Sequence, residues 1–298
     1  MFRNIVVGVD QHEGTRDAIA LAKNLLARDG HLTLAHVYPG DPHVYRSASP
    51  AYEAGERERA LELLEKTRGQ EGIEAELSCI ESPSAGRGLH SLAERQRADL
   101  LVVGSCRRGL VGRVLIGDDT RAALNGAPCA VAIAPTGHRN ESPLMREIGV
   151  GYDGSPESNH AVEVARTLAN ERGAKLSAFK AVAMPATALT PGPLGLGEMI
   201  AALVDDARDS IAALGGIEPH AAYGPPAEEL ALYSASLDLL VVGSRGYGPF
   251  GRLIHGSTSQ QLARIARCSL LVLTRGARDA ETDETATGGR EPAVAARA

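Results

Sequence analysis

The chain has 298 residues, 44% of them hydrophobic and 23% charged, which is enough for two domains that each bury a core. The net charge of −6 argues against the clustered basic surface that nucleic-acid binding requires. No apolar run is long enough to cross a bilayer, and the start of the chain lacks the pattern of an export signal. We therefore expect a cytoplasmic protein with no nucleic-acid or membrane partner.

In the first half, short β-rich runs alternate with helical patterns, which favours βαβ units and a parallel sheet covered by helices. The expected strands lie near residues 3–9, 31–37, 73–79, 99–103 and 129–133. The expected helices lie near residues 13–28, 53–69, 85–96 and 118–125.

The second half repeats this order after a polar segment. Its expected strands lie near residues 147–152, 175–182, 217–222, 238–242 and 269–273. Its expected helices lie near residues 156–172, 197–214, 226–235 and 257–266. The predicted fold class is therefore α/β, with two tandem doubly wound domains, each a five-stranded, mainly parallel sheet flanked by helices. We place the domains at 1–135 and 146–275, the linker at 136–145 and a disordered tail at 276–298.

The two halves are copies of one pattern. The run Leu100–Gly104 has the same sequence as Leu239–Gly243, and each run is followed, thirteen residues after its glycine, by another glycine, Gly117 or Gly256. A repeat of this length indicates paired domains rather than solenoid units. Cys129 and Cys268 occupy matching positions at the start of the last strand in each half, where we expect small buried side chains. The four cysteines do not have the spacing of a metal site.

Glycines in the second half stand where a strand becomes a loop and where the loop becomes a helix. Gly243 and Gly246 follow a buried strand, and Gly256 precedes Ser257 and Thr258 at a helix start. Glycine lets the backbone approach an anion closely, and a helix start supplies free N–H groups and partial positive charge. This loop therefore predicts a phosphate site.

With these features the chain resembles a tandem universal stress protein. The signature of that family is Gly, two residues, Gly, nine residues, Gly and then Ser or Thr after the fourth strand, with an Asp that ends the first strand. The loop from Gly243 to Thr258 and the distant Asp153 match it. The resemblance covers about residues 1–135 and 145–275.

The resemblance implies an ATP-binding domain in which the loop holds the triphosphate and Asp153 meets the nucleoside. Ala181, at the end of the second strand, would contact adenine through its backbone. An alternative role for Asp153 is to cap the following helix, which Ser155 could also do. The predicted binding residues are Gly151, Tyr152, Asp153, Ala181, Val242, Gly243, Gly246, Gly256, Ser257 and Thr258.

The first half departs from this signature. Arg107 stands where the second glycine should be, and Asp118 and Asp119 replace Ser257 and Thr258. At ~4 Å and an effective dielectric constant of ~20, each pair of like unit charges costs about 4 kcal/mol, which would weaken triphosphate binding by orders of magnitude. We therefore predict one competent nucleotide site, in the C-terminal half.

A second interpretation of the first half keeps it as a binding site. Asp118 and Asp119 would then hold Mg²⁺ that bridges to phosphate, helped by Arg107 and Arg108. The expected cofactor is thus ATP, with or without Mg²⁺.

Efficient turnover requires a base or metal carboxylates near the γ-phosphate, and the loop from Gly243 to Thr258 contains no acid. We expect a nucleotide-responsive regulator in stress adaptation. One alternative is a slow ATP hydrolase or an autophosphorylating protein, with Ser257 or Thr258 as acceptor. Another alternative is a ligand-free scaffold for a protein partner.

The last strand of each half, near residues 129–133 and 269–273, is apolar, and an exposed edge of that kind seeks a partner. The resemblance implies that these strands pair with each other, which makes the chain an internal pseudo-dimer. Association of two chains into a homodimer is left open.

Overall fold

The computed structural model describes residues 1–39, 50–105, 118–141, 144–183, 195–244 and 257–273. The first half contains β1 (Phe2–Gly8), α1 (Gly14–Leu25), β2 (Leu26–Tyr38), α2 (Pro50–Glu71), β3 (Glu76–Glu81), α3 (Ala85–Gln96), β4 (Leu100–Gly104), α4 (Asp118–Leu124) and β5 (Ala130–Ala134). A short helix, α5 (His138–Glu141), follows. The predicted tail lies outside the described residues.

The second half contains β6 (Glu147–Gly151), α6 (Pro156–Arg172), β7 (Lys175–Val182), α7 (Leu196–Ala212), β8 (Glu218–Tyr223), α8 (Pro226–Tyr233), the 3-10 helix η2 (Ser234–Ser236), β9 (Leu239–Gly243), α9 (Ser257–Ile265) and β10 (Ser269–Leu273). No helix within the described ranges is both long and apolar enough to span a membrane.

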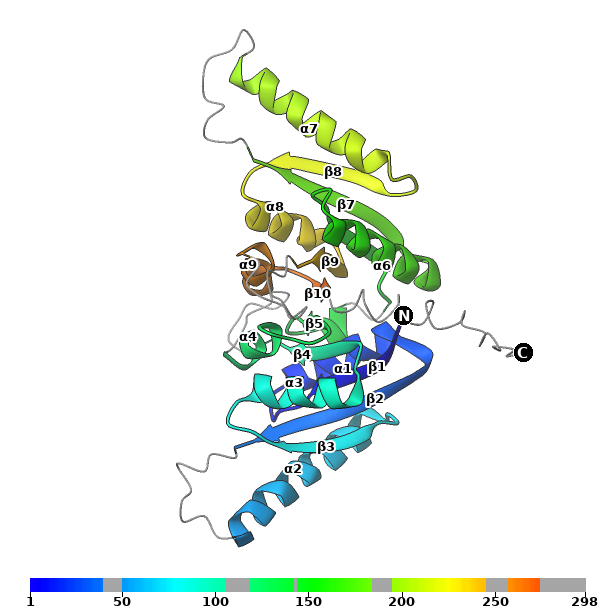
Figure 1. The fold of residues 1–298 in the computed structure, drawn as a ribbon. Coiled ribbons are helices and arrows are strands. Elements are labelled where there is room, and N and C mark those ends of the chain that lie inside the picture. The colour runs from blue at the N-terminus through cyan, green and yellow to red at the C-terminus, as the bar shows by residue number, and fades with distance from the viewer. Residues whose placement is uncertain (40–49, 106–117, 142–143, 184–194, 245–256, 274–298) are drawn as a thin grey trace, which may run out of the picture.

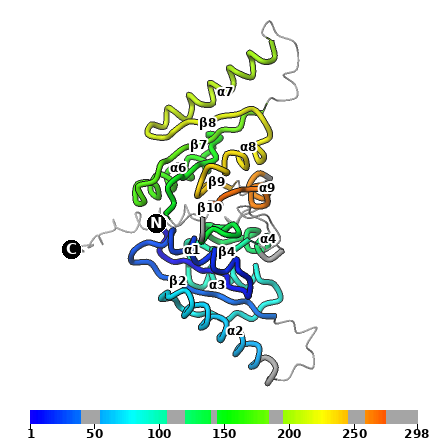
Figure 2. The backbone as a smooth tube through the Cα atoms, turned by 180° about the vertical axis from the view of Figure 1, so that it is seen from behind, coloured from blue at the N-terminus to red at the C-terminus, as the bar shows by residue number. Residues whose placement is uncertain are grey.

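All ten strands form one sheet in the order β3-β2-β1-β4-β5-β10-β9-β6-β7-β8. Neighbouring strands run parallel within each half, and the two halves meet where β5 and β10 pair antiparallel, with Leu271 opposite Ala132. The α/β fold class is therefore confirmed, and the expected pairing of the last strands is observed. Figures 1 and 2 show α2 and α7 at opposite ends of the sheet, farthest from this seam.

The core forms two layers, one on each face of the sheet. Along β4, Leu100 and Val102 point into one cluster of buried side chains, and Leu101 and Val103 point into the other. Helices α1, α2, α6 and α7 cover the first cluster, and α3, α4, α8 and α9 cover the second. Strands buried on both faces explain why their sequences are continuous apolar runs.

One expected boundary needs correction. The first helix is predicted to reach residue 28, but α1 ends at Leu25, because Leu26 adopts an extended backbone and pairs with Phe2 at the start of β2. The predicted linker contains α5, which packs against α1, and both His138 and Met145 are buried.

The cysteines behave as the sequence predicts. Cys129 and Cys268 are each 4% exposed, immediately before β5 and β10. Burial raises the pKa of the Cys129 thiol to about 12 and raises the pKa of Cys268 further, so both are neutral packing residues.

Candidate functional site

A cavity of about 330 Å³ opens at the carboxyl ends of β6, β7 and β9. This is where open parallel sheets bind ligands, and the volume lies within the range of about 300–1,000 Å³ that is typical of small-molecule sites. Seven of the ten predicted binding residues line it: Gly151, Tyr152, Asp153, Ala181, Val242, Gly243 and Thr258. Ser257 begins α9, with no description of its side chain, and Gly246 and Gly256 lie outside the described residues.

The turn after β6 distinguishes the two roles considered for Asp153. Its Oδ1 accepts a hydrogen bond from the Ser155 amide at 2.9 Å, around Gly154, whose φ of 82° suits glycine. The cap of α6 is Ser155, whose Oγ accepts the Ser158 amide at 3.2 Å, with a proline following it at the helix start. The capping role therefore belongs to Ser155, and Asp153 remains exposed at the cavity.

Gly243 is required by packing. A Cβ at this position would lie 2.6 Å from the carbonyl oxygen of Glu157, at the start of α6. Gly104 meets the backbone of Gly14 in the same way in the first half. The sequence predicts that glycine at this position leaves room for phosphates. The structure gives a different reason for a glycine here, because the first turn of α6 packs directly on the end of β9.

Several lining residues were missed by the sequence interpretation. The apolar ones are Pro226, Leu230 and Leu262, and the polar ones are Glu157, Ser158 and Ser259. Leu230 and Leu262 lie on the buried faces of α8 and α9, so their helical periodicity could have indicated that they face the sheet near its carboxyl edge. Glu157 is an acid supplied by α6, outside the glycine loop in which acids were sought.

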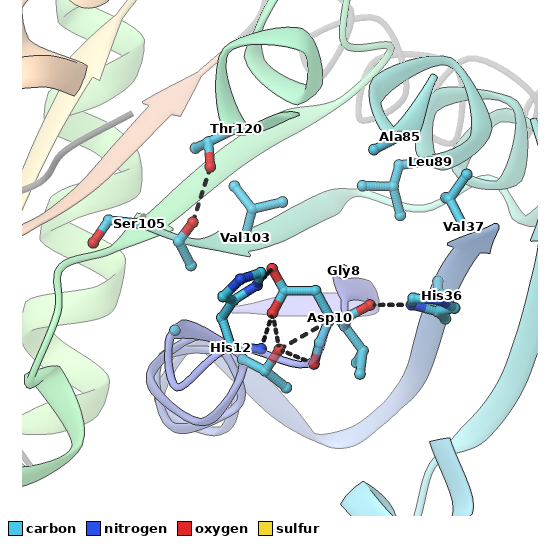
Figure 3. A pocket seen from close by; sticks show the side chains of 15 residues that line it. Gly8, Asp10, His12, His36, Val37, Ala85, Leu89, Val103, Ser105 and Thr120 are labelled. Carbon is cyan, nitrogen blue, oxygen red and sulfur yellow. Dashed lines mark hydrogen bonds and ion pairs between the residues drawn. The ribbon is translucent and has the colours of Figure 1, made fainter. Parts of the chain in front are cut away.

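The first half has a cavity at the equivalent place, with a volume of about 250 Å³ (Figure 3). Asp10 lies there in the position of Asp153. Its Oδ2 is 3.0 Å from Nδ1 of His12, and its Oδ1 accepts the His12 amide and the Thr15 hydroxyl, both at 2.9 Å. Asp10 is thus held by the loop and by the first turn of α1.

Two other side chains shape this first cavity. Nδ1 of His36 is 2.7 Å from the carbonyl oxygen of Val9, and the Thr120 hydroxyl donates to the carbonyl oxygen of Gly104 at 3.0 Å (Figure 3). Val37 occupies the place that Ala181 has in the second cavity, and the larger side chain narrows the site.

Neither cavity contains a described metal centre. No group of three His, Cys, Asp or Glu side chains in the described ranges could hold a metal ion. Asp118 and Asp119 begin α4, with no description of their side chains, so the interpretation in which they hold Mg²⁺ stays a prediction.

The fold and the two cavities define a tandem doubly wound α/β protein with a cavity at the carboxyl edge of the sheet in each half. The sequence model of the universal stress protein family matches residues 1–135 and 145–274, so the chain belongs to the universal stress protein family.

Curated relatives agree with this assignment. A universal stress protein of Mycobacterium tuberculosis is 28% identical over 290 residues, which cover 90% of this chain and 96% of the relative. A shorter universal stress protein of Thermus aquaticus is 32% identical over 143 residues, which cover 44% of this chain and 99% of the relative.

Solved structures share the fold across the whole chain. A universal stress protein from Archaeoglobus fulgidus has a TM-score of 0.65 at 19% identity and covers 91% of this chain, with 98% of its own length matched. A universal stress protein described as putative from Pseudomonas aeruginosa has a TM-score of 0.60 at 21% identity, with 96% of this chain and 98% of its own covered.

Proposed function

We propose that this universal stress protein binds ATP in its C-terminal cavity and acts as a nucleotide-responsive regulator in stress adaptation. The observation that carries the proposal is that seven of the predicted residues line a single cavity, from the ends of β6, β7 and β9, the turn after β6 and the start of α9. Neighbouring parallel strands bring these residues together at the edge where such sheets bind ligands.

The chemistry around the cavity differs from one part to another, as a nucleotide requires. Ala181, Leu230 and Val242 provide small and apolar surface for a purine ring. The Asp153 carboxylate can accept hydrogen bonds from ribose hydroxyls. Thr258 and Ser259, in the first turn of α9, stand where helix N–H groups and the helix dipole favour phosphate.

Binding without efficient turnover fits the donor set better than hydrolysis does. The carboxylates that line the described cavity are Asp153, assigned to ribose, and Glu157. Glu157 belongs to α6, and its backbone packs against Gly243 of β9. Slow ATP hydrolysis remains the second candidate because Glu157 is present. The variant Glu157→Gln tests it: loss of phosphate release would assign hydrolysis to this carboxylate, and phosphate release that survives in the variant does not use it.

The proposal is tested by measuring ATP stoichiometry with isothermal titration calorimetry on the full chain. We expect one ATP per chain. Asp153→Ala should weaken binding about 10- to 100-fold, because a hydrogen bond to a charged group contributes about 1.5–3 kcal/mol. Asp10→Ala is the matched variant in the first half, and we expect it to leave ATP affinity unchanged. Cyclic AMP, which lacks the β- and γ-phosphates, should bind more weakly than ATP.

Two equivalent ATP sites per chain would contradict the assignment to one half. Equal effects of Asp153→Ala and Asp10→Ala would contradict the role given to Asp153. If neither ATP nor cyclic AMP binds, and ATP gives no thermal stabilisation, the ligand-free scaffold replaces the proposed function.

A further inference from the structure

His138 joins the two halves of the molecule from inside the segment that connects them. The side chain, on α5, is 3% exposed, and its Nδ1 lies 3.0 Å from Oγ of Ser269, a fully buried residue at the start of β10. Nε2 is also buried and has no hydrogen-bond partner within the described part of the chain. A buried polar atom without a partner is costly, and it is rare enough to need an explanation.

The backbone on both sides of His138 is fixed to the first half. Asp17 of α1 is 5% exposed, and its two carboxylate oxygens accept the amides of Gly137 at 2.9 Å and Arg139 at 3.0 Å. Arg139 also forms an ion pair of 3.6 Å with Glu71 at the end of α2. His138 therefore has its backbone attached to α1 and its imidazole bonded to β10, so it connects one half to the other.

A polar cavity of about 290 Å³ lies at this place, lined by His138 and Ser269 and by residues that precede β9 and β10. A polar space of this size can admit water, which gives protons access to the seam. Access of protons to this place matters because histidine is the residue whose ordinary side-chain pKa is closest to physiological pH.

The charged groups around His138 oppose each other. Asp17 and Asp238 favour the protonated imidazole, but burial outweighs them and lowers the pKa of His138 below its ordinary value. Asp17 already accepts two backbone amides, and Asp238 accepts those of Arg146 and Glu147.

The remaining ionisable neighbours offer no counter-charge. Cys268 lines the cavity as a neutral thiol because burial raises its pKa. Arg267, which also lines it, and Arg139 are both cations. A protonated His138 would thus add positive charge to a buried place that holds no additional anion within the described residues.

We propose that His138 is a proton-sensitive latch, which is closed when its imidazole is neutral and releases the contact between α5 and β10 when it takes up a proton. If the Nδ1–H group donates to Ser269, the added proton goes to Nε2, which has no acceptor in the described structure. If instead the Ser269 hydroxyl donates to Nδ1, the added proton goes to Nδ1 and the hydroxyl must rotate to become the acceptor, while the Nε2–H group has no acceptor in the described structure. Either route disfavours the closed seam.

The direction of the pH effect follows from linkage. In the opened seam the imidazole meets water and takes its ordinary affinity for protons, whereas the closed seam holds them less tightly. The opened form therefore binds more protons, and the closed seam loses stability as the pH falls below about 6.5. The loss continues until the pH reaches the lower pKa of the closed state. The change in the opening equilibrium is at most about tenfold per pH unit.

Hydrogen exchange of the Arg267 and Ser269 amides measures this opening at the start of β10. These amides donate to Ser234 Oγ at 2.9 Å and to the Asp238 carbonyl oxygen at 3.3 Å, beside the contact with His138. In the full chain, we expect the equilibrium constant for this opening, corrected for intrinsic exchange rates, to increase several-fold from pH 7 to pH 5.5. His138→Gln can bond to Ser269 but cannot titrate, so it should remove this dependence. His31→Gln, at an exposed position on β2, is the matched control and should retain it.

NMR titration of the His138 imidazole in the wild-type protein is the second measurement, and it does not depend on the variant folding. We expect His138 to titrate below the ordinary histidine range. The latch is overturned if His138 titrates at or above about 6.5. It is also overturned if exchange of the two amides has the same pH dependence in His138→Gln as in the wild type.

Discussion

At the end of β1, Asp10 is bonded to His12 and Thr15, whereas at the end of β6, Asp153 accepts an amide while Ser155 caps the next helix. Helix α1 has no side-chain cap, and α6 has one. Each aspartate thus accepts the amide two residues further on. In the first half Asp10 also contacts the side chains of Thr15 and of His12, which stands where the second half has Ser155. In the second half Ser155 caps α6, and under the proposed function Asp153 binds the ligand.

The comparison also shows which features the halves share for reasons of packing. Gly104 and Gly243 both lie under the first turn of a helix, and the apolar strands β4 and β9 have the same sequence and the same burial. Conserving the architecture while changing the bonds around one carboxylate is how a duplicated domain can keep its fold and alter its site.

The largest expected effect comes from restoring the first-half loop. Combining Arg107→Gly, Asp118→Ser and Asp119→Thr removes like charges that cost about 4 kcal/mol each at ~4 Å, so a second ATP site should appear. Calorimetric stoichiometry should rise from one to two. Gly246→Arg is the reciprocal change and should abolish binding in the second half. A stoichiometry that stays at one would show that the loop is not what separates the halves.

Truncating equivalent core residues should affect both halves alike. Leu101 and Leu240 are fully buried at matching positions of β4 and β9. Leu101→Ala and Leu240→Ala should each lower the free energy of unfolding by about 2–5 kcal/mol, because each leaves a cavity. Chemical denaturation measures the loss. Leu232→Ala, at a site 55% exposed, should change stability by less than about 0.5 kcal/mol. A large difference between the two core variants would mean that the halves do not share one packing pattern.

Adding a methyl group under the helix starts should have a smaller cost. Gly243→Ala places a Cβ 2.6 Å from the Glu157 carbonyl oxygen, and Gly104→Ala meets the Gly14 backbone. We expect each to destabilise the protein by about 1–3 kcal/mol through overpacking, as measured by thermal unfolding without nucleotide. Gly197→Ala in α7 faces open space and should be neutral or stabilising. If Gly243→Ala instead lowers only ATP affinity, the glycine serves the ligand rather than the packing.

The smallest effect concerns Asp99, whose carboxylate binds backbone amides at the start of β1. Asp99 accepts the amides of Arg3 at 2.7 Å and Asn4 at 3.0 Å, and burial raises its pKa above the ordinary value. The folded state therefore holds this proton more tightly than the unfolded state does. The contribution of Asp99 is present below the unfolded-state pKa of about 4 and is lost as pH rises through the folded-state pKa.

Asp99→Asn should flatten this part of the stability curve, where stability falls as the pH rises above about 4, by less than about 1 kcal/mol after solvent screening. Melting temperatures across that range measure it. Asp238→Asn changes the equivalent carboxylate, which accepts the amides of Arg146 and Glu147 at the start of β6, and so controls for the loss of such hydrogen bonds. A steeper fall of stability in Asp99→Asn than in the wild type would reverse the sign and contradict the raised pKa.

Most of the fold could be predicted because it depends on local patterns that occur twice. The bounds of α3, α6, β7 and β10 agree with the predicted ranges. Proline and glycine mark the ends of α6, at Pro156 and Gly173, whereas α3 is followed by Arg97, which has a φ of 51°. The tandem order made each half a check on the other.

The errors arose where structure depends on distant residues. Helix α5 lies in a polar segment where Asp17, about 120 residues earlier, accepts the amide of Gly137 just before the helix and the amide of Arg139 within it. No local pattern indicates this. Likewise, the reason for Gly243 is the approach of Glu157, which is distant in sequence. The predicted roles of Gly246 and Gly256 stay predictions.

The antiparallel pairing of β5 with β10 has a consequence for assembly. Because β5 and β10 belong to one polypeptide, their pairing is a unimolecular event whose equilibrium does not change when the protein is diluted. A pair of separate single-domain chains would have to find each other at cellular concentration. Under the proposed function, the tether keeps a half without a nucleotide site beside a half that has one, so the asymmetric pair would exist in every molecule rather than in a fraction of a mixed population.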